Sequence, residues 1–336
     1  MPRAIILGGT GAIGRSTTAR LLAAGWDVDY TGRDPARAVR ELNAAGARFL
    51  RFDNDEPGSV RAVVGAGAEL VVDCVCFTAA HAADLVRSLD AVDHAVMISS
   101  KAVYVDAAGN HSNSPVPPDF GGAIRESQPT LPPGFDDYRS AIGYGTNKVA
   151  AENVLLDSGR PVSILRPSKI HGAGSANPRE WEFARRVLDR REAVLLAHRG
   201  VGVDHTTAAA NVAALVEVVA GLRSTQILNI GDPDAPSALG IARAVAAHLG
   251  HGWREVLLDE DAPTALGRTA WDAIPPRVLD MSAALALGYR PAGTYAELVG
   301  EELDWLIANR AVLDLSEFDN GFDYVAEDAY LASHPD

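Results

Sequence analysis

The sequence predicts an α/β fold in which a doubly wound parallel sheet is followed by a smaller, mixed α/β part. Two observations lead to this prediction. The first is a glycine-rich turn directly after the first apolar run, and the second is a regular alternation of strand-like and helical patterns through the first half. Such alternation is typical of a parallel sheet with helices on both faces, in which ligands bind at the carboxyl ends of the strands.

The glycine-rich turn lies within the first fourteen residues. Ala4 to Leu7 is an apolar run long enough for one buried strand, and a helical pattern begins near Ile13. Between them lies the spacing Gly-x-x-Gly-x-x-Gly, at Gly8, Gly11 and Gly14. Glycines at a strand-to-helix turn let a pyrophosphate approach the backbone and the N–H groups that open the helix. The turn therefore predicts a Rossmann fold with a dinucleotide site.

The other elements of the first half follow in alternation. We expect strands at 26–31, 47–52, 70–77, 94–99 and 162–165, and helices at 13–24, 35–45, 57–64, 79–89 and 144–156. The stretch 106–136 is rich in Pro, Gly, Ser and Asn, which predicts one long loop. Loops of this length in a compact domain are usually functional or mobile.

The pattern changes after His171. We expect helices at 179–190, 205–221, 237–249, 280–287 and 294–309, and short strands at 194–197, 227–230 and 255–258. The expected organisation is a dinucleotide-binding domain (1–170), an interleaved substrate-binding part (171–313) whose strand at 226–230 returns to the main sheet, and an acidic tail (314–336). The tail has weak periodicity, so a lid, a dimer arm and disorder all stay open for it.

Composition narrows the class of partner. Of the 336 residues, 47% are hydrophobic and 22% are charged, and the net charge is −14. Nucleic-acid binding needs a basic surface, so we expect no nucleic-acid partner. The chain shows no leader pattern and no apolar run of membrane-spanning length, which predicts a cytoplasmic protein without a membrane partner. Cys74 and Cys76 are expected to pack side by side on one face of a strand, without a disulfide framework.

A serine at a strand end and a Tyr–Lys pair on a helix form the candidate catalytic set. Ser100 follows the strand at 94–99, and Tyr144 and Lys148 lie one helical turn apart on one face. A free tyrosine has a pKa near 10, but a neighbouring lysine favours its phenolate form. Beside a nicotinamide, such a tyrosine can exchange a proton with a hydroxyl or carbonyl while a serine hydroxyl holds the same oxygen. The set predicts hydride transfer at a carbinol carbon.

These motifs together resemble the extended or atypical short-chain dehydrogenase/reductases of the NAD-dependent epimerase/dehydratase family. The matching pieces occur in the family's order between about residues 3 and 308: GGTGAIG at 8–14, ISSKAVY at 98–104, ESQP at 126–129, YGTNK at 144–148 with Glu152, LRP at 165–167, NVA at 211–213, NIGD at 229–232 and LGY at 287–289. The set is specific for the family but not for a substrate.

The resemblance implies a role for each matched position. Ser100 is the catalytic serine, Tyr144 is the acid/base, and Lys148 is its partner and also holds the nicotinamide ribose. Asp53 would lie by the adenine, Cys76 and Phe77 would pass under the cofactor, and Pro167 would line the nicotinamide. The expected cofactor-binding residues are Gly8, Thr10, Gly11, Ala12, Ile13, Gly14, Arg33, Asp53, Asn54, Cys76, Phe77, Lys148 and Pro167.

The end of the second strand bears on the choice of cofactor. Family members that prefer NAD usually carry an acid there, which holds the adenosine ribose hydroxyls. This chain has Gly32 followed by Arg33, with Arg37 one turn later. A guanidinium suits a 2′-phosphate, so we expect NADP(H) as the preferred cofactor and NAD(H) as the alternative. The adjacent Asp34 would oppose a phosphate, and a solvated Arg33 is the competing interpretation.

The resemblance constrains the substrate less tightly. Family dehydratases carry an acid just after the catalytic serine or threonine, where this chain has Lys101 and Ala102, so elimination is disfavoured. Many nucleotide-sugar enzymes carry Asn after Arg-Pro, where this chain has Ser168 and Lys169, so a nucleotide sugar is not the default substrate. The candidate substrate residues are His81, Lys101, His171, Arg179, Trp181 and His205. An ordinary structural role is open for each of them, and their spacing predicts no metal site.

We therefore expect an NAD(P)-dependent oxidoreductase that transfers hydride between nicotinamide and a carbinol or keto carbon of a small, polar, sugar-like substrate. The first alternative is an epimerase that acts on a sugar or nucleotide sugar and retains its cofactor. The second is a non-catalytic member that senses a nucleotide or binds a macromolecule. Dimers through the helix at 144–156 are common in the family, so a homodimer is a further expectation.

Overall fold

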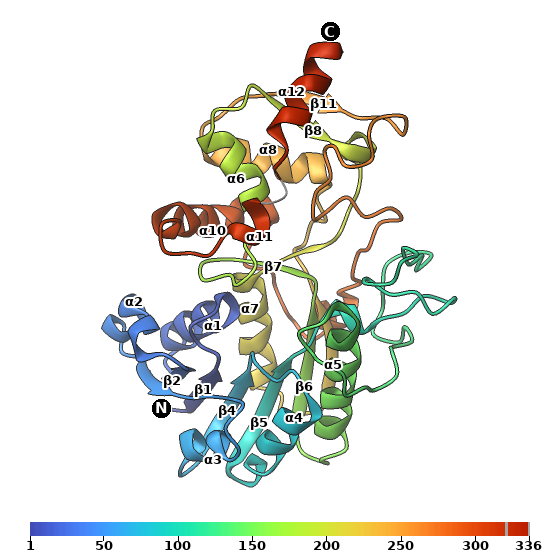
Figure 1. The fold of residues 1–336 in the computed structure, drawn as a ribbon. Helices are drawn as coiled ribbons and strands as arrows, with labels where there is room; N and C mark the ends of the chain where they lie inside the picture. Colours follow the sequence, from blue (N-terminus) through green and yellow to red (C-terminus); the bar gives the residue numbers. More distant parts are fainter. Residues whose placement is uncertain (320–321, 335–336) are drawn as a thin grey trace.

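The computed structural model describes residues 1–319 and 322–334 and has two lobes, with the main sheet in one and most of the C-terminal half in the other (Figure 1). Within these residues the main sheet has seven parallel strands in the order β10-β6-β5-β4-β1-β2-β3. Their bounds are β1 Arg3–Leu7, β2 Asp27–Gly32, β3 Arg48–Arg51, β4 Ala68–Asp73, β5 Val92–Ile98, β6 Val162–Pro167 and β10 Gln226–Ile230. The strand order reverses at β1, so the predicted doubly wound sheet is confirmed.

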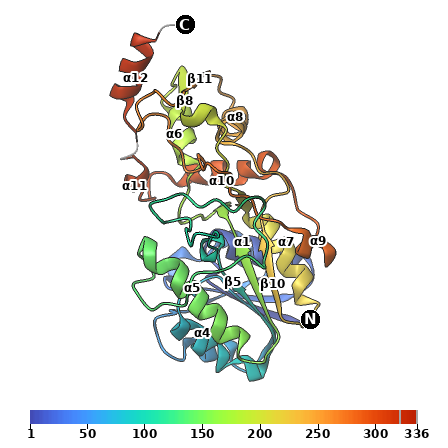
Figure 2. The same cartoon turned by 90° about the vertical axis from the view of Figure 1, so that its right-hand side faces the viewer.

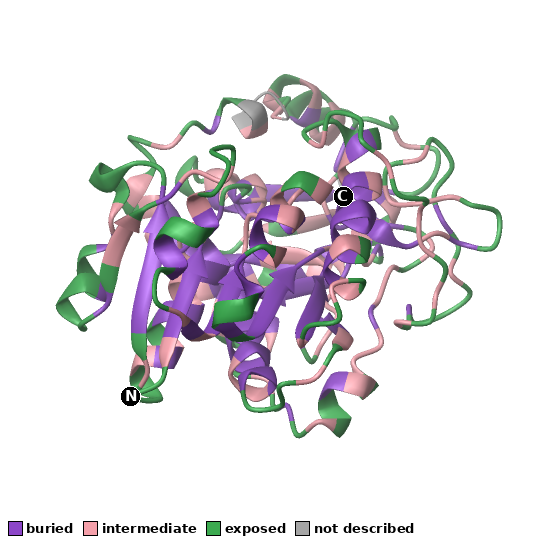
Figure 3. Cartoon of the chain, turned by 90° about the horizontal axis from the view of Figure 1, so that it is seen from below, coloured by how far each residue is buried: buried purple, intermediate pink, exposed green. Residues whose placement is uncertain are grey.

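Helices cover both faces of this sheet because its strands are apolar on both faces. Along β1, Ala4 and Ile6 face one core cluster, Ile5 and Leu7 face another, and all four are 0% exposed. The first cluster includes residues of α1 (Ala12–Ala23), α2 (Arg40–Ala44), α7 (Ala209–Ala220) and α9 (Ser282–Ala286), and the second includes residues of α3 (Ser59–Val64), α4 (Ala79–Val86) and α5 (Ala141–Leu156). Figure 2 shows the two helical layers on either side of the strands, and Figure 3 shows the buried strands between them.

The second lobe has a core of its own. It contains α6 (Trp181–Leu188), α8 (Ala238–His248), α10 (Tyr295–Asn309) and a parallel pair of strands, β8 (Ala193–Leu196) and β11 (Arg254–Leu257). In its core the rings of Phe183 and Trp271 stack with centroids 6.0 Å apart, and Tyr295 of α10 is buried in the same cluster. The chain first enters this lobe through β7 (Lys169–His171) and returns to the main sheet through β9 (Thr206–Ala208), which pair in parallel. It enters the lobe a second time after β10. This crossing brings loops of the second lobe to the carboxyl edge of the main sheet.

Two helices differ from the sequence-based expectation. The helix expected at 35–45 is divided into a 3-10 turn (Pro35–Arg37) and α2. The helix expected at 205–221 begins only at Ala209, because residues 206–208 pair with β7 instead. A β-strand was not expected there because three residues are too few for a period to be read.

The two cysteines lie on opposite sides of the sheet, so the expectation that they share one face is wrong. Cys74 packs against the first core cluster and Cys76 belongs to the second. The reason is that β4 ends at Asp73, after which the backbone no longer alternates as a strand. Both cysteines are free.

The described part of the tail is helical and docked. It forms α11 (Ser316–Asp319) and α12 (Tyr324–Ser333), while positions 320–321 and 335–336 of the expected tail lie outside the described residues. Arg186 of α6 donates to Glu327 at 2.5 Å, and Arg191 bonds Asp328. These bonds hold α12 at the end of the second lobe that is farthest from the main sheet, which does not suit a lid over the sheet edge (Figure 1). Among residues 1–319 and 322–334, none of the helices is both long and apolar enough to cross a membrane.

Candidate functional site

The glycine turn between β1 and α1 is built by close packing of backbone. Gly8 has a φ of +78°, a conformation that side chains with a Cβ rarely adopt. A Cβ added to Gly14 would lie 2.5 Å from the Gly8 carbonyl oxygen and from the Gly9 Cα. A Cβ added to Gly9 would lie 2.5 Å from Cβ of Tyr30 on β2. These three glycines are therefore required by the turn itself.

Gly11 differs from its neighbours because the space beside it is open. A Cβ added to Gly11 would meet only the Gly8 carbonyl oxygen, at 3.7 Å. Gly11 is also the N-cap of α1, and no side chain accepts a hydrogen bond from the first turn of that helix. The N–H groups of a first helical turn need an acceptor from outside the helix, and an anion suits the positive end of the helix dipole. The turn thus fits the pyrophosphate of a dinucleotide, with residues 10–14 as its cradle.

Lys148 is fixed at the carboxyl edge of the sheet, between the end of β5 and the loop that follows β4. Its Nζ donates to the backbone carbonyls of Cys76 at 2.8 Å and Ile98 at 2.9 Å, and the residue is 2% exposed. The same Nζ lies 4.5 Å from the ring centroid of Phe77 and 5.9 Å from that of Tyr144. An ammonium has three N–H donors, and the two carbonyls use two of them. One donor and the positive charge are therefore left beside the Tyr144 ring.

The helix α5 that carries Tyr144 and Lys148 is anchored by a buried ion pair. Glu152 of α5 pairs with Arg166 of β6 through Nε at 3.0 Å and Nη2 at 2.5 Å, and the Ser99 hydroxyl also donates to Glu152. Arg166 lies 4.9 Å from the ring centroid of Tyr104, whose hydroxyl donates to Asn229 of β10 at 2.7 Å. This network joins α5 to β6, to β10 and to the segment that follows β5.

Ser100 lies two residues after the end of β5, next to the strand end that the sequence predicts. Its hydroxyl accepts from the Ala102 N–H at 3.1 Å, so Ser100 caps a 3-10 turn at Lys101–Val103. The serine is half-buried, and so is Tyr144 on α5. At the end of the neighbouring strand β4, burial raises the pKa of Asp73 to about 6. The carboxyl ends of β4 and β5 thus place the serine and a buried carboxyl group at the edge of the sheet where Lys148 is held.

Phe77 and Tyr138 form an aromatic wall next to Lys148. Their rings stack with centroids 5.1 Å apart, and His81 lies edge-on to both. His81 Nδ1 accepts from the Phe77 N–H at 3.2 Å, and Asn54 donates to the Val75 carbonyl at 3.0 Å. The structure therefore brings Asn54, Phe77 and His81 together, and His81 holds the loop that follows β4.

The guanidinium that follows the end of β2, that of Arg33, is exposed to solvent. Gly32 packs so closely that an added Cβ would lie 2.9 Å from Thr10 Cγ2, and Arg33 after it is exposed. The Asp34 carboxylate accepts from the Ala36 N–H at 2.9 Å and caps the 3-10 turn at Pro35–Arg37. Asp34 is thus engaged in the local turn. Asp53, at the end of β3, likewise accepts from a backbone N–H nearby, that of Asp55.

Lys101 lies in a buried cluster of charges below Ser100. Its Nζ bonds Asp204, whose other carboxylate oxygen lies 3.5 Å from Lys169 Nζ and 3.8 Å from Arg277. Burial, together with the charges of Lys169 and Arg277, holds the pKa of Lys101 well below its usual range. Burial and the charge of Arg179 lower the pKa of Lys169 to about 8. Lys101 is fully engaged in this ion pair, whereas Lys169 is partly exposed.

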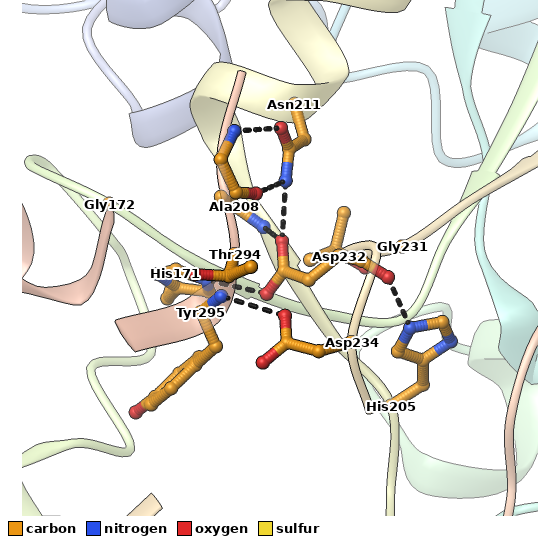
Figure 4. Close-up of polar contacts among 12 residues, drawn as sticks. His171, Gly172, His205, Ala208, Asn211, Gly231, Asp232, Asp234, Thr294 and Tyr295 are labelled. Atoms are coloured by element: carbon orange, nitrogen blue, oxygen red, sulfur yellow. Dashed lines mark hydrogen bonds and ion pairs between the residues drawn. The ribbon is translucent and has the colours of Figure 1, made fainter. Parts of the chain in front are cut away.

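Asp232, two residues after the end of β10, organises the junction of the two lobes (Figure 4). One carboxylate oxygen accepts from the Ala208 N–H at 2.6 Å and from Asn211 at 2.8 Å, and the other contacts His171 Nε2 at 2.9 Å. The Asp232 carbonyl is 2.9 Å from His205 Nε2. The carboxylate therefore ties β7 to the start of α7.

Besides Lys101, three more of the expected substrate residues are buried within the protein. His171 is 1% exposed, Trp181 lies in the core of the second lobe, and His205 has both ring nitrogens occupied, by Asp232 and by the Leu279 N–H at 3.0 Å. Arg179 is half-buried in the loop before α6. Substrate contact by these residues stays a prediction.

A family model described as NAD(P)H-binding matches residues 8–185, which is more than half of the 336-residue chain. The chain belongs to this NAD(P)H-binding family. The matched region runs from the glycine turn through α5 to α6, and so contains Ser100, Tyr144 and Lys148. Together with the relatives described next, the match confirms the resemblance to the extended short-chain dehydrogenase/reductases.

Two curated relatives of this NAD(P)H-binding protein match part of its length. A dTDP-L-rhamnose 4-epimerase of Burkholderia thailandensis is 26% identical over 238 residues, which are 64% of this chain and 63% of the relative. A 2'-dehydrokanamycin reductase of Streptomyces kanamyceticus is 29% identical over 154 residues, which are 46% of this chain and 37% of the relative. The chain therefore spans less than two thirds of the length of either relative.

Solved structures match this NAD(P)H-binding protein over nearly all of its length, at low sequence identity. A UDP-glucose-4-epimerase from Stenotrophomonas maltophila, with bound NAD and formylated UDP-arabinopyranose, gives a TM-score of 0.71 at 17% identity and covers 93% of this chain and 100% of that one. A putative epimerase from Burkholderia cenocepacia gives 0.70 at 18% identity, with 91% and 98% covered. These matches confirm the Rossmann-type fold.

The sequence-based reasoning missed the acids of the interior: Asp204, Asp232, Glu180 and Glu302. Glu302 carried a usable signal, since it lies among Val299, Leu303 and Leu306 on the apolar face of α10. Asp232 followed a predicted strand end, where ligand-binding residues gather in this fold. Glu180 carried a weaker signal, because it lies three and four residues before Phe183 and Ala184 in the helix expected at 179–190. Asp204 lies in no periodic pattern that would have indicated its burial.

Proposed function

We propose that this protein is an oxidoreductase that prefers NADP(H) and transfers hydride to or from a carbinol or keto carbon of a small, polar, sugar-like substrate. The observation that carries the proposal is the position of Lys148. Its buried ammonium is held by the Ile98 carbonyl at the end of β5 and by the Cys76 carbonyl in the loop after β4, one helical turn from Tyr144. An ordinary surface Tyr–Lys pair would not be fixed at the edge of the sheet where ligands bind.

Each residue of this set has a distinct task in the proposed reaction. When bound, the nicotinamide supplies or accepts the hydride. Tyr144 gives the proton to the substrate oxygen during reduction and takes it during oxidation. Lys148 stabilises the phenolate that Tyr144 becomes, and its third N–H can reach a ribose hydroxyl. Ser100 donates a hydrogen bond to the substrate oxygen.

Arg33 supports the preference for NADP(H). It is exposed after a strand that ends without an acid, and the neighbouring Asp34 is occupied as a cap. We expect Arg33→Ala to weaken NADPH binding by about 10- to 100-fold, the value of one charge-assisted contact, with little change for NADH. Fluorescence titration of both nucleotides tests this. Arg61→Ala, at an exposed position on α3, is the control and should change neither affinity. Equal losses for both nucleotides in Arg33→Ala would contradict the assignment.

Alanine substitutions at Gly11 and Gly14 distinguish an effect on cofactor binding from an effect on folding. We expect Gly11→Ala to keep the wild-type melting temperature, because the space beside Gly11 is open in the folded chain, but to lose about tenfold or more in dinucleotide affinity. We expect Gly14→Ala to lower the melting temperature, because its Cβ would meet backbone at 2.5 Å. Thermal unfolding without nucleotide and titration with NADPH test both variants. A Gly11→Ala variant that binds normally would show that no pyrophosphate approaches this turn.

The second candidate function is that of an epimerase. The first of the two curated relatives, a dTDP-L-rhamnose 4-epimerase, supports this alternative. The same residues would then oxidise and re-reduce one substrate, and the cofactor would stay bound throughout. The deciding experiment is mass spectrometry of the nucleotide that is released from denatured protein, followed by assays on a ketone and alcohol panel. Empty protein that consumes NADPH with a ketone supports the reductase. Stoichiometric retained NAD(H), without net consumption, would overturn it in favour of the epimerase. Tight nucleotide binding without any turnover would instead favour a non-catalytic member.

A further inference from the structure

Three acidic or imidazole side chains from distant segments converge in the interior beside the glycine turn. They are His171 at the end of β7, Glu180 just before α6, and Glu302 on α10. One potential ligand atom of each lies within 4.8 Å of the other two. The residues are 1%, 2% and 0% exposed, so water is largely excluded from the cluster. The three side chains come together because α10 and α6 pack against the segment that follows β7.

Each of these residues uses one polar atom inside the protein and leaves the other without a hydrogen-bond partner among the described residues. The engaged atoms are His171 Nε2, 2.9 Å from Asp232; Glu180 Oε1, 3.2 Å from the Tyr295 hydroxyl; and Glu302 Oε2, 2.6 Å from the Gly172 N–H. The unpartnered atoms are His171 Nδ1, Glu180 Oε2 and Glu302 Oε1. A buried carboxylate oxygen without a partner is costly, and two of them together call for a positive charge.

The Asp232 contact orients the imidazole for a metal ion. Asp232 already accepts two N–H bonds on its other oxygen, from Ala208 and Asn211. As an acceptor for Nε2–H of the neutral imidazole, it leaves the lone pair of His171 on Nδ1, which has no hydrogen-bond partner among the described residues. A carboxylate that holds the far nitrogen of a histidine is the usual outer arrangement around a metal-bound imidazole.

We propose that His171 Nδ1, Glu180 Oε2 and Glu302 Oε1 bind one divalent transition-metal ion, Zn²⁺ or Mn²⁺. One imidazole and two carboxylates suit these ions, whereas Ca²⁺ and Mg²⁺ prefer sites made of oxygen alone. The competing occupant is a proton shared between Glu180 and Glu302, because burial and the neighbouring Glu180 carboxyl group raise the pKa of Glu302. The proposal departs from the sequence-based expectation of no metal, because three ligands so widely separated in the chain leave no spacing signal.

The ion would brace the two lobes at the cofactor turn, so its role is structural. Gly172, between ligand His171 and the loop that follows, packs so closely that an added Cβ would lie 2.9 Å from Ala209 Cβ and 3.7 Å from Ala12 Cβ. Ala12 is the first residue of α1, and Glu302 holds the Gly172 N–H. Metal bound to Glu302 would thus fix the loop that covers the start of α1. This inference is independent of the proposed redox chemistry.

Metal analysis of tag-free protein tests the proposal. We expect about one Zn²⁺ or Mn²⁺ per chain by mass spectrometry of the native protein, loss on treatment with a chelator, and a melting temperature that rises with added ZnCl₂ or MnCl₂. Co²⁺ loaded into the stripped wild-type protein should give visible d–d absorption, which needs no variant. Protein that neither retains nor rebinds Zn²⁺, Mn²⁺ or Co²⁺ would overturn the proposal.

Variants separate the metal from the shared proton. Glu302→Gln should abolish metal retention and the response of the melting temperature to added metal. The control is His248→Gln, which removes an exposed histidine–carboxylate contact with Asp304 and should leave metal content unchanged. If the occupant were a proton, Glu302→Gln would mimic the protonated acid, and its melting temperature would equal or exceed that of the wild type without any metal. That result would also overturn the proposal.

Discussion

The Tyr144→Phe variant is expected to turn over its substrate about 10²- to 10⁴-fold more slowly than the wild type, the range typical of a lost general acid–base group. The ring would stay in place, because the phenyl ring of Phe fills the same position 5.9 Å from Lys148 Nζ. Only the hydroxyl that carries the proton is removed. Dinucleotide affinity should therefore stay within about twofold, since the binding contacts lie at the glycine turn and at Lys148. Steady-state assays and nucleotide titration measure the two quantities.

Tyr138→Phe is the matched control for this experiment. Tyr138 belongs to the aromatic wall next to Lys148, where its ring stacks on Phe77 with centroids 5.1 Å apart. It lies in the loop that precedes α5. This variant also loses a phenol hydroxyl, and its ring would still stack on Phe77. We expect turnover within a few-fold of the wild type. If Tyr144→Phe retained most of its activity, or if Tyr138→Phe lost as much, Tyr144 would not be the acid/base.

The Glu152→Gln variant is expected to lose about 3–5 kcal/mol of unfolding free energy, the usual cost of removing one partner of a buried ion pair. Glu152 and Arg166 are 2% and 4% exposed and are joined by two hydrogen bonds. The amide would leave the Arg166 charge buried without compensation. The Ser99 hydroxyl would also lose its charged acceptor. Because the pair joins α5 to β6, the loss would reach the helix that carries Tyr144 and Lys148.

Urea unfolding followed by circular dichroism measures this effect. The control is Glu56→Gln, which breaks the exposed Arg51–Glu56 pair and should leave the urea midpoint close to that of the wild type. A double variant, Glu152→Leu with Arg166→Met, removes both charges and should be less destabilised than Glu152→Gln alone. Similar midpoints for Glu152→Gln and the wild type would mean that water reaches Arg166, and the assignment of a buried pair would be wrong.

Local chemistry was sufficient to predict the fold class and the position of the catalytic candidates. Short apolar runs between helical patterns predicted the doubly wound sheet, because strands that are buried on both faces must be apolar throughout. Gly8, Gly11 and Gly14 predicted the first turn, and the structure shows why Gly8 and Gly14 are needed there. Tyr144 and Lys148 were predicted to share a helix face because residues four apart lie one turn from each other.

Only the tertiary structure decided which polar groups face one another in the interior. Lys101 pairs with Asp204, and His171 meets Glu180 and Glu302, across segments far apart in the chain. The sequence periodicity does not indicate these contacts, because they depend on how α6 and α10 pack against β7 and β9 between the lobes. The sequence by itself therefore determined the sheet, the glycine turn and the Tyr–Lys pair, all of which depend on local spacing. The buried charges depend on long-range packing, where desolvation makes each unpaired group costly and so selects its partner.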